Sequence, residues 1–526
     1  MTVSKSGLSG LSLRTLAAVA TTVLAASASP AVQAGFVAPS WSDYNDDGYD
    51  DLAIGVPYES VGTHPGAGAV HVLYGGPNGL SSAGSQRWNA DLATPFTDPQ
   101  DNAHFGWALA SGNFDGDAYD DLAIGSPHLD YANAVDTGGY FVLFGSSSGL
   151  SATGSRHEAA YSMFSTDTNG WELGYALAAV DALSNDNGAP GSDGTADLAM
   201  GIPGAGSDRG FVSLQAWNGE GGHGKGLGPS AGLAGDRCGE ALAGGDLDSY
   251  AGMDVAIGCP NRNTSAVDSG CVFLIHQGLA TEKLICQNAA PAQTPEVNDH
   301  FGSRLAVGDL NADGLDDLVV GVPDEDLGAG ADAGVVHIFR GHATDGVNLM
   351  ETVLSQESTG VPGGSAANDR FGAALAIGDF SAFNSFTHAD DLAVGVPGDD
   401  VGSIDRAGAV VALYWQNGAM LTSGNQRWTQ DSTGVLEGSA ANDQFGSSLG
   451  AGMYSDSGAC DLAISVPLED LAGPVKNAGA VNVLYGSTNK LTADGDQLWH
   501  QNSTGIADTA EQADRFGLSL GSRPAR

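Results

Sequence analysis

The chain of 526 residues repeats one short apolar segment seven times. Each copy begins with Asp and ends with Pro, and the copies are DLAIGVP (51–57), DLAIGSP (121–127), DLAMGIP (197–203), DVAIGCP (254–260), DLVVGVP (317–323), DLAVGVP (391–397) and DLAISVP (461–467). Consecutive prolines are 57 to 76 residues apart. A period of this length, kept along the chain, is typical of radial or solenoid repetition and argues against a conventional two-layer domain.

One repeat contains four strand-like segments. In residues 301–359, FGSRLAVGDL and ETVLSQ alternate apolar with small or polar residues, LVVGVP is continuously apolar, and GVVHIF is rich in β-branched residues. The 78 glycines, against only 19 lysines and arginines, fit many short strands joined by tight turns. The sequence therefore predicts an all-β fold, a seven-bladed β-propeller of four-stranded antiparallel blades.

A Phe-Gly pair, or a close variant of it, opens the first strand of each repeat. The pairs are Phe105-Gly106, Leu173-Gly174, Cys238-Gly239, Phe301-Gly302, Phe371-Gly372, Phe445-Gly446 and Phe516-Gly517. The first apolar copy has no such pair before it, and the last pair has no apolar copy after it. We therefore expect residues 515–521 to supply the innermost strand of the first blade and to close the ring. The expected blades are 516–526 plus 35–104, 105–170, 171–237, 238–300, 301–370, 371–444 and 445–515.

A Phe-Gly pair followed by Gly-Val-Pro, with an aspartate-rich loop between them, resembles the FG-GAP repeat of the integrin α-subunit head and of many bacterial exported proteins. The resemblance covers essentially all of residues 35–526. It implies a cell-adhesion or binding module for a protein or glycan ligand, with recognition on the face opposite the aspartate loops. Propellers also carry enzymes, so the alternative is an enzyme or enzyme subunit, such as a polysaccharide or phosphodiester hydrolase that uses the channel.

In three repeats, the loop between the first and second strands carries oxygen side chains at alternate positions. Residues 43–51 read DYNDDGYDD, 113–121 read NFDGDAYDD and 309–317 read DLNADGLDD. Ca²⁺ takes about six to eight oxygen ligands, and a central Gly permits the sharp turn. We therefore expect about three structural Ca²⁺ sites. The candidate ligands are Asp43, Asn45, Asp47, Tyr49, Asp51, Asn113, Asp115, Asp117, Tyr119, Asp121, Asp309, Asn311, Asp313, Leu315 and Asp317, where Tyr49, Tyr119 and Leu315 would act through main-chain carbonyls.

The other loops fit this pattern less well. Ala118 replaces the preferred Gly in 113–121, so weaker calcium binding is expected there. The loop at 246–254 has Tyr250 at position 5, and the loop at 453–461 has lost its first acid. Loops that start at Asp181 and Asp379 contain insertions. The competing interpretation is that such Asp, Asn and Gly runs are solvated turns. Their recurrence at equivalent positions of an acidic chain favours calcium.

The amino-terminal 34 residues have the pattern of a secretory signal peptide. Lys5 and Arg14 precede an apolar stretch from Leu16 to Ala26, and Val32-Gln33-Ala34 places small residues at the cleavage positions. A membrane anchor is the alternative, but the apolar stretch is shorter than the roughly 20 residues of a spanning helix. We expect a mature chain, 35–526, that is secreted, periplasmic or on the cell surface, without a membrane span.

The formal net charge of −44 disfavours nucleic acid and anionic lipid as partners. It favours bound divalent cations or a cationic partner, although adaptation to a salty medium would also explain it.

Four of the five cysteines fall within one repeat. In an exported chain this clustering predicts local disulfides rather than a metal site, and three pairings are possible. Cys271 and Cys286 flank a candidate hairpin turn at Gly278 and would face each other, which leaves Cys238 to pair with Cys259.

The sequence offers little evidence for catalysis. GSSSG at 145–149 matches the GxSxG string of serine hydrolases, but it occupies the turn between the third and fourth strands, where other repeats have GGPNGL and GSTNKL. The twelve histidines form no HExxH motif. We therefore interpret the chain as a binding module and not as an enzyme.

Overall fold

The computed structural model describes residues 42–521 except 94–97, 165–167, 185–188, 191, 217–222, 229–231, 277, 288–293, 329, 383–388 and 474. The signal peptide expected at 1–34 lies outside the described residues. Within them, no helix is long and apolar enough to cross a membrane.

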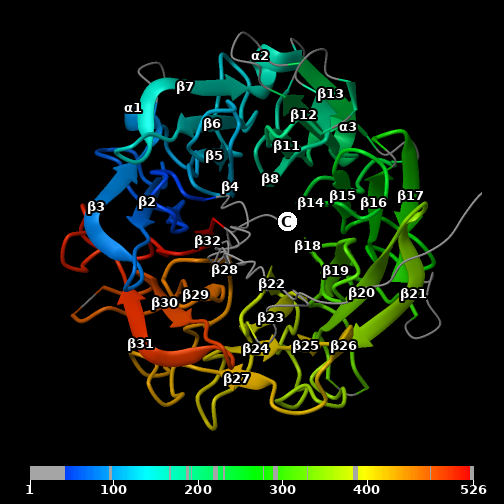
Figure 1. Cartoon of the computed structure of the whole chain (residues 1–526). Helices are drawn as coiled ribbons and strands as arrows, with labels where there is room; N and C mark the ends of the chain where they lie inside the picture. Colours follow the sequence, from blue (N-terminus) through cyan, green and yellow to red (C-terminus); the bar gives the residue numbers. More distant parts are fainter. Residues whose placement is uncertain are drawn as a thin grey trace, which may run out of the picture. The chain divides into compact units, whose positions relative to one another are not determined.

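Residues 39–526 form one compact unit, and its described part is a seven-bladed β-propeller of four-stranded antiparallel sheets, as the repeat predicts. Figure 1 shows the sheets arranged around a central axis, with one short strand of each sheet nearest the centre. From the outer to the inner strand, the first three blades are β3 (Ser81–Trp88), β2 (Ala69–Tyr74), β1 (Leu52–Val56) and β32 (Ser519–Leu520); β7 (Ser151–Ala159), β6 (Gly139–Phe144), β5 (Asp121–Ser126) and β4 (Leu109–Gly112); and β13 (His223–Leu227), β12 (Phe211–Ala216), β11 (Asp197–Ile202) and β8 (Leu177–Val180).

The remaining four blades follow the same order. They are β17 (Thr281–Ile285), β16 (Cys271–His276), β15 (Asp254–Cys259) and β14 (Ala241–Gly245); β21 (Gly346–Leu354), β20 (Val335–His342), β19 (Asp317–Val322) and β18 (Arg304–Gly308); β27 (Gln426–Trp428), β24 (Ala409–Leu413), β23 (Asp391–Val396) and β22 (Ala374–Gly378); and β31 (Thr492–Trp499), β30 (Ala480–Tyr485), β29 (Asp461–Val466) and β28 (Leu449–Gly452). Short additional elements are α1 (Ala90–Ala93), α2 (Ala160–Phe164), α3 (Ala205–Asp208), β9 (Leu183–Ser184), β10 (Ala189–Pro190), β25 (Trp415–Gln416) and β26 (Ala419–Met420).

The second strand of every blade is the repeated apolar segment, and all its residues are buried. Both faces of this strand are covered because each blade packs against a neighbouring blade on either side. Ile54 belongs to a core cluster with Val481 and Val483 of blade 7, whereas Ala53 packs in a cluster with Leu122 of blade 2. These core clusters therefore lie between neighbouring blades. Full burial of one such aliphatic side chain contributes about 1.5–3 kcal/mol to folding.

The Gly of the Gly-Val-Pro segment marks the closest approach of two blades. A Cβ on Gly55 would lie 2.3 Å from the carbonyl oxygen of Gly106 in the next blade, and one on Gly125 would lie 2.1 Å from that of Gly174. Gly201, Gly258, Gly321 and Gly395 stand equally close to the carbonyl of the following Phe-Gly pair. In these six blades, the Phe-Gly and Gly-Val-Pro segments thus form a contact in which there is no room for a side chain, whereas blade 7 has Ser465 at this position.

The ring closes as the sequence predicts. Strand β32 pairs with β1, with Ile54 opposite Leu520 and Gly55 opposite Ser519. The main-chain N–H of Gly517 donates to the carbonyl of Gly55 at 3.1 Å, and that of Gly521 donates to Ala53 at 2.8 Å. The first blade therefore takes its innermost strand from the far end of the described chain.

Both predicted disulfides are present, and both lie in blade 4. Cys238 is bonded to Cys259, and Cys271 to Cys286. Cys259 and Cys271 are also register partners in the pairing of β15 with β16. The four cysteines therefore connect the four strands of this blade along one end, while Cys460 in blade 7 is a buried thiol.

A buried histidine beside the closure predicts acid sensitivity. His71 is 2% exposed and packs on the ring of Phe516, with 5.5 Å between ring centroids, and burial lowers its pKa from 6.5 to about 4. The stabilisation from the neutral imidazole is complete above pH 6.5 and is lost as the pH falls from there towards 4, because the unfolded chain then binds the additional proton. The resulting fall in the free energy of unfolding reaches about 3 kcal/mol.

Blade 6 carries Val411 at the register position of His71, so the matched substitution is His71→Val. Urea unfolding between pH 7 and pH 4.5 should show a smaller fall in the free energy of unfolding for this variant than for the wild-type chain. His64→Gln, at an imidazole 43% exposed, is the control and should keep the wild-type slope. An equal slope for His71→Val would contradict the prediction.

Candidate metal centre and channel mouth

The aspartate loops lie at one end of the blades, where the inner strand leads into the second strand. In blade 5 the loop runs between β18 and β19, and in blade 2 between β4 and β5. In blade 1 the loop at 43–51 precedes β1, because the inner strand of that blade comes from the carboxyl end. All these loops therefore share one face of the propeller.

The loops of blades 1 and 5 bring the same oxygen atoms together. Asp43 Oδ1 and Asn45 Oδ1 both accept the N–H of Asp47, at 3.1 and 3.0 Å. In blade 5, Asp309 Oδ1 and Asn311 Oδ1 accept the N–H of Asp313, at 3.2 and 2.8 Å. Oxygens that converge on one polarised N–H also suit a hard cation, so the side-chain oxygens at positions 1 and 3 fit calcium, while the carboxylates at position 5 accept the N–H of position 7.

The loop of blade 2 is built differently. Asn113 Nδ2 donates to the carbonyl of Asp117 at 2.7 Å, and Asn113 Oδ1 accepts the N–H of Gly116. The amide nitrogen of Asn113 thus contacts the loop interior, where positions 1 of the other two loops supply an oxygen. Asp115 and Asp117 accept the N–H groups of residues two places further on, as positions 3 and 5 do in blades 1 and 5, so the difference lies at position 1. The structure therefore brings together two of the three expected ligand sets in the same way, and the third in a different arrangement.

The ninth loop residue has a structural role that sequence reasoning missed. Asp121 is fully buried, and its carboxylate accepts the N–H of Phe114 at 2.8 Å and of Gly145 at 2.9 Å. Asp51 accepts from Tyr44 and Gly75 in the same way. Burial raises the pKa of Asp121 to about 8 and that of Asp51 well above its ordinary value. The carboxylate joins the loop to the end of the third strand, whether or not a cation is bound.

A signal for this role was present in the sequence. All seven apolar copies begin with Asp, including blades 4 and 7, whose loops have lost other acids. Asp317 likewise accepts the main-chain N–H groups of Leu310 and Gly341, and Arg340 Nη1 also donates a hydrogen bond to its Oδ2.

The acids of the degenerate loops bind other side chains of the same blade. Asp181 accepts Ser192 Oγ at 2.6 Å, so the insertion of blade 3 folds back on it, and Asp248 contacts His276 Nδ1 at 3.1 Å. The insertion after Asp379 lies partly outside the described residues. Across the described ranges, no group of three or more His, Cys, Asp or Glu side chains is arranged to hold a metal ion. A site in the aspartate loops therefore depends on Asn and main-chain oxygens as well.

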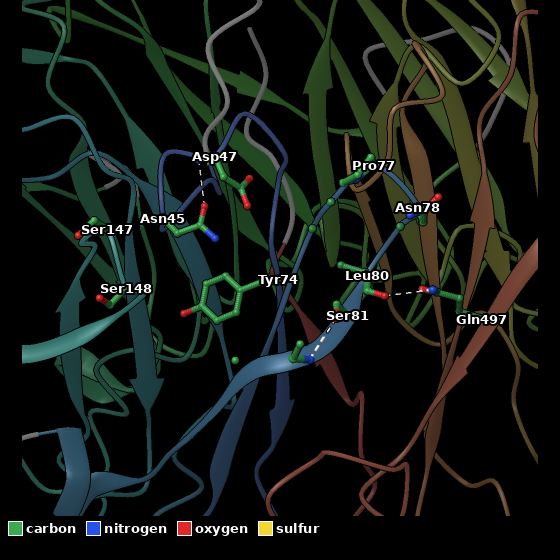
Figure 2. Close-up of a pocket in the computed structure, with 15 residues that line it drawn as sticks. Asn45, Asp47, Tyr74, Pro77, Asn78, Leu80, Ser81, Ser147, Ser148 and Gln497 are labelled. Carbon is green, nitrogen blue, oxygen red and sulfur yellow. Dashed lines mark hydrogen bonds between the residues drawn. The ribbon is translucent and has the colours of Figure 1, made fainter.

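The loop of blade 1 borders an open polar cleft of about 620 Å³. Figure 2 shows Asn45 and Asp47 above Tyr74, with Ser147 and Ser148 on one flank and Asn78 on the other. Ser147, in the GxSxG string, lies in the turn between β6 and β7 as expected.

The opposite face carries the mouth of the channel, a cavity of about 740 Å³ at the beginnings of the inner strands. The residue after each Phe-Gly pair lines it, and these seven residues are Trp107, Tyr175, Glu240, Ser303, Ala373, Ser447 and Leu518. Three consecutive blades thus contribute two aromatic rings and a carboxylate, while the next three contribute small residues. The residue before each pair has a positive φ of 50–61° in all seven blades, a conformation uncommon outside glycine.

Ionic and aromatic contacts fix the side chains around this mouth. The rings of Trp107 and Tyr175 lie 5.6 Å apart, and the guanidinium of Arg237 lies over Tyr175 and pairs with Glu240. Arg370 contacts Asp324 at 2.7 Å, and the hydrogen bond that His300 Nδ1 donates to the Asp324 carboxylate raises the pKa of His300. The mouth is therefore asymmetric, polar and aromatic, whereas the strands behind it are nearly identical.

Comparison with protein families agrees with this architecture. Residues 37–73, 105–141 and 301–339 match the FG-GAP repeat. The chain carries FG-GAP repeats. Its integrin-like propeller is similar to integrin alpha-PS5 of Drosophila melanogaster, with 41% identity over 86 residues, 16% of this chain and 8% of that protein.

The FG-GAP propeller is also similar to an enzyme. Phosphatidylinositol-glycan-specific phospholipase D of Rattus norvegicus is 32% identical over 190 residues, 35% of this chain and 20% of that protein, and the same-named protein of Bos taurus is 34% identical over 182 residues, 33% of this chain and 19% of that protein. The matched segments span about a fifth of these relatives or less.

The role of the ninth loop residue predicts a stability effect independent of calcium. Asp121→Ala removes the carboxylate that accepts the buried N–H of Phe114 and the half-buried N–H of Gly145, and loss of the acceptor of a buried N–H costs about 1–3 kcal/mol. Denaturant unfolding in chelator should show this loss. Asp117→Ala, which removes one exposed acceptor of Tyr119, is the control and should stay within about 0.5 kcal/mol of wild type. Equal stability of both variants would refute a structural role for Asp121.

Proposed function

We propose that this propeller is an exported, calcium-stabilised module that binds a protein or glycan ligand through the channel mouth. The observation that carries the proposal is the departure of the mouth from the repeat. The Phe-Gly pair and the apolar Asp-to-Pro segment repeat nearly the same residues in every blade, but the residues directly after the Phe-Gly pairs, which line the mouth, differ from blade to blade. Stability alone explains the repeated positions and gives no reason for the variation.

Calcium would act by offsetting carboxylate repulsion in the aspartate loops. Asp43, Asn45 and Asp47 would hold it in blade 1 with the carbonyl of Tyr49, and Asp309, Asn311 and Asp313 in blade 5 with the carbonyl of Leu315. Asp51 and Asp317 would add carboxylate oxygens that already accept main-chain N–H groups. A cation in these loops would hold the inner strand against the second strand. Two disulfides are consistent with an oxidising compartment outside the cytoplasm.

The calcium proposal is tested by thermal unfolding with calcium and with chelator. A cation that binds only the folded chain stabilises it by about 2.7 kcal/mol at a concentration 100 times its dissociation constant. Asp47→Ala and Asp313→Ala should each reduce the difference between the two melting temperatures. Asp456→Ala, an exposed acid in the degenerate loop of blade 7, should leave the difference unchanged. Equal melting temperatures with calcium and chelator in the wild-type chain would contradict structural calcium.

Ligand binding at the mouth is tested by capture of partners and by glycan arrays with the calcium-loaded chain. Trp107→Ala and Tyr175→Ala should weaken binding of the captured ligand by at least about tenfold, because large aromatic side chains dominate such contacts. Asn78→Ala, on the metal-loop face, should bind as wild type. Full binding by both aromatic variants would place recognition elsewhere.

The relatives named phospholipase D support a second candidate, a part of an enzyme that acts on phosphatidylinositol glycans. The similarity spans about a fifth of those relatives, so it applies to a region and not to their whole activity. Hydrolysis of a phosphatidylinositol glycan by this chain, lost on Glu240→Gln at the mouth, would favour the enzyme. Absence of turnover together with mouth-dependent binding would favour the adhesion or binding module.

A further inference from the structure

A buried aspartate lies two residues before the Phe-Gly pair at five of the seven junctions between blades. The five are at most 2% exposed, and they are Asp236, Asp299, Asp369, Asp443 and Asp514. Each accepts, through Oδ2, the N–H of the residue three places earlier. These junctions lie on the face of the channel mouth, away from the aspartate loops. Each must keep a carboxylate in a nearly dry site.

An arginine accompanies the carboxylates at three of these junctions. Arg262 Nη1 contacts Asp236 at 2.6 Å, where Arg262 occupies the second position after the repeated Pro. The other junctions have an acid at that position. Arg87 contacts one of these acids, Glu59, at 3.3 Å, and Arg427 contacts another, Asp399, at 2.9 Å. The chain thus shows that a cation fits beside the buried aspartate.

The two remaining junctions combine two carboxylates without an arginine. Glu325 and Asp299 are each 1% exposed, and Glu469 and Asp443 are 6% and 2% exposed. In the described residues, none of the four pairs with Lys or Arg. The strand positions of Arg87 and Arg427 hold Val353 in blade 5 and Leu498 in blade 7.

A buried glutamine amide completes each of these two groups. Gln287 is 0% exposed, its Nε2 donates to Glu325 Oε2 at 2.5 Å, and it also hydrogen-bonds to Asp299. Gln430 is 1% exposed and donates to Glu469 Oε2 at 2.7 Å. Within the part of the chain that the structure describes, Oε1 has no hydrogen-bond partner in either residue. The same unpartnered Oε1 occurs in Gln356 and Gln501 at the two arginine junctions that bury a second acid.

We propose that the junctions Glu325–Asp299–Gln287 and Glu469–Asp443–Gln430 each bind a hard divalent cation of the calcium type. Leaving two carboxylates buried and uncompensated costs several kcal/mol for each ion. Rotation of the amide by 180° exchanges its nitrogen and oxygen, so Oε1 can join the two carboxylates as a ligand. Carboxylate and amide oxygens are the donors that calcium selects. The cation would occupy the place that Arg262 takes beside Asp236.

The experiment counts the calcium ions that remain bound to the mature chain after dialysis at limiting free calcium, by elemental analysis. Glu325→Gln and Glu469→Gln together should bind about two fewer ions per chain than wild type. Glu59→Gln, the same change beside Arg87, should bind the wild-type number. The Asp47→Ala and Asp313→Ala variants are measured separately. If the aspartate loops bind no calcium, the double Gln variant should still bind about two fewer ions than wild type.

A second variant guards against simple unfolding. Glu325→Arg with Glu469→Arg copies the Arg262 arrangement and should be at least as stable as wild type in chelator, while binding about two fewer calcium ions. Burial raises the pKa of Glu325 to about 8 and that of Glu469 to about 7, so the rival occupant is a proton. The cation proposal would be wrong if the Glu325→Gln, Glu469→Gln variant bound as many calcium ions as wild type and were more stable than wild type above pH 8. Protonation of the two glutamates would then explain how the junctions keep two carboxyl groups buried.

Discussion

The close approach of neighbouring blades at the Gly-Val-Pro glycine is the contact on which the propeller depends. In blades 1 to 6 the carbonyl of the next Phe-Gly pair lies where a Cβ would stand, so a larger residue in these blades would push the neighbouring blade away. This contact places the buried second strands side by side and creates the core between blades. It also fixes the beginnings of the inner strands, which position the side chains of the channel mouth. Blade 7 has Ser465 at this position, and its Oγ lies close to Gly517 at the closure.

Most of the architecture could be predicted because the apolar segment and the Phe-Gly pair, or a close variant, each occur seven times in the sequence. Repetition converts weak local signals into a strong one, and the missing Phe-Gly partner of the first blade located the closure by residue number. The hairpin register around Gly278 was sufficient for the disulfide partners, since Cys271 and Cys286 are equidistant from the turn. Each of these inferences needed only period, spacing and hydrophobicity.

The details of the sites depended on contacts that spacing does not encode. Asn113 and Asp43 occupy equivalent loop positions, but an amide can donate to the Asp117 carbonyl and a carboxylate cannot, so the two loops differ. The ninth aspartate was interpreted only as a ligand, because its main-chain partners Phe114 and Gly145 come from two separate segments. The junction glutamines gave no signal at all, since Gln287 and Glu325 meet only after two blades have packed together.

The closure has a consequence for synthesis. Residues 55 and 519 pair directly, although hundreds of residues separate them along the chain. At a synthesis rate of about 5–20 residues per second, β1 therefore emerges tens of seconds before its inner partner exists. During that interval the edge of β1 presents free N–H and C=O groups that can pair with the wrong strand. The nascent first blade therefore needs protection from pairing with other chains until β32 has been synthesised and pairs with β1.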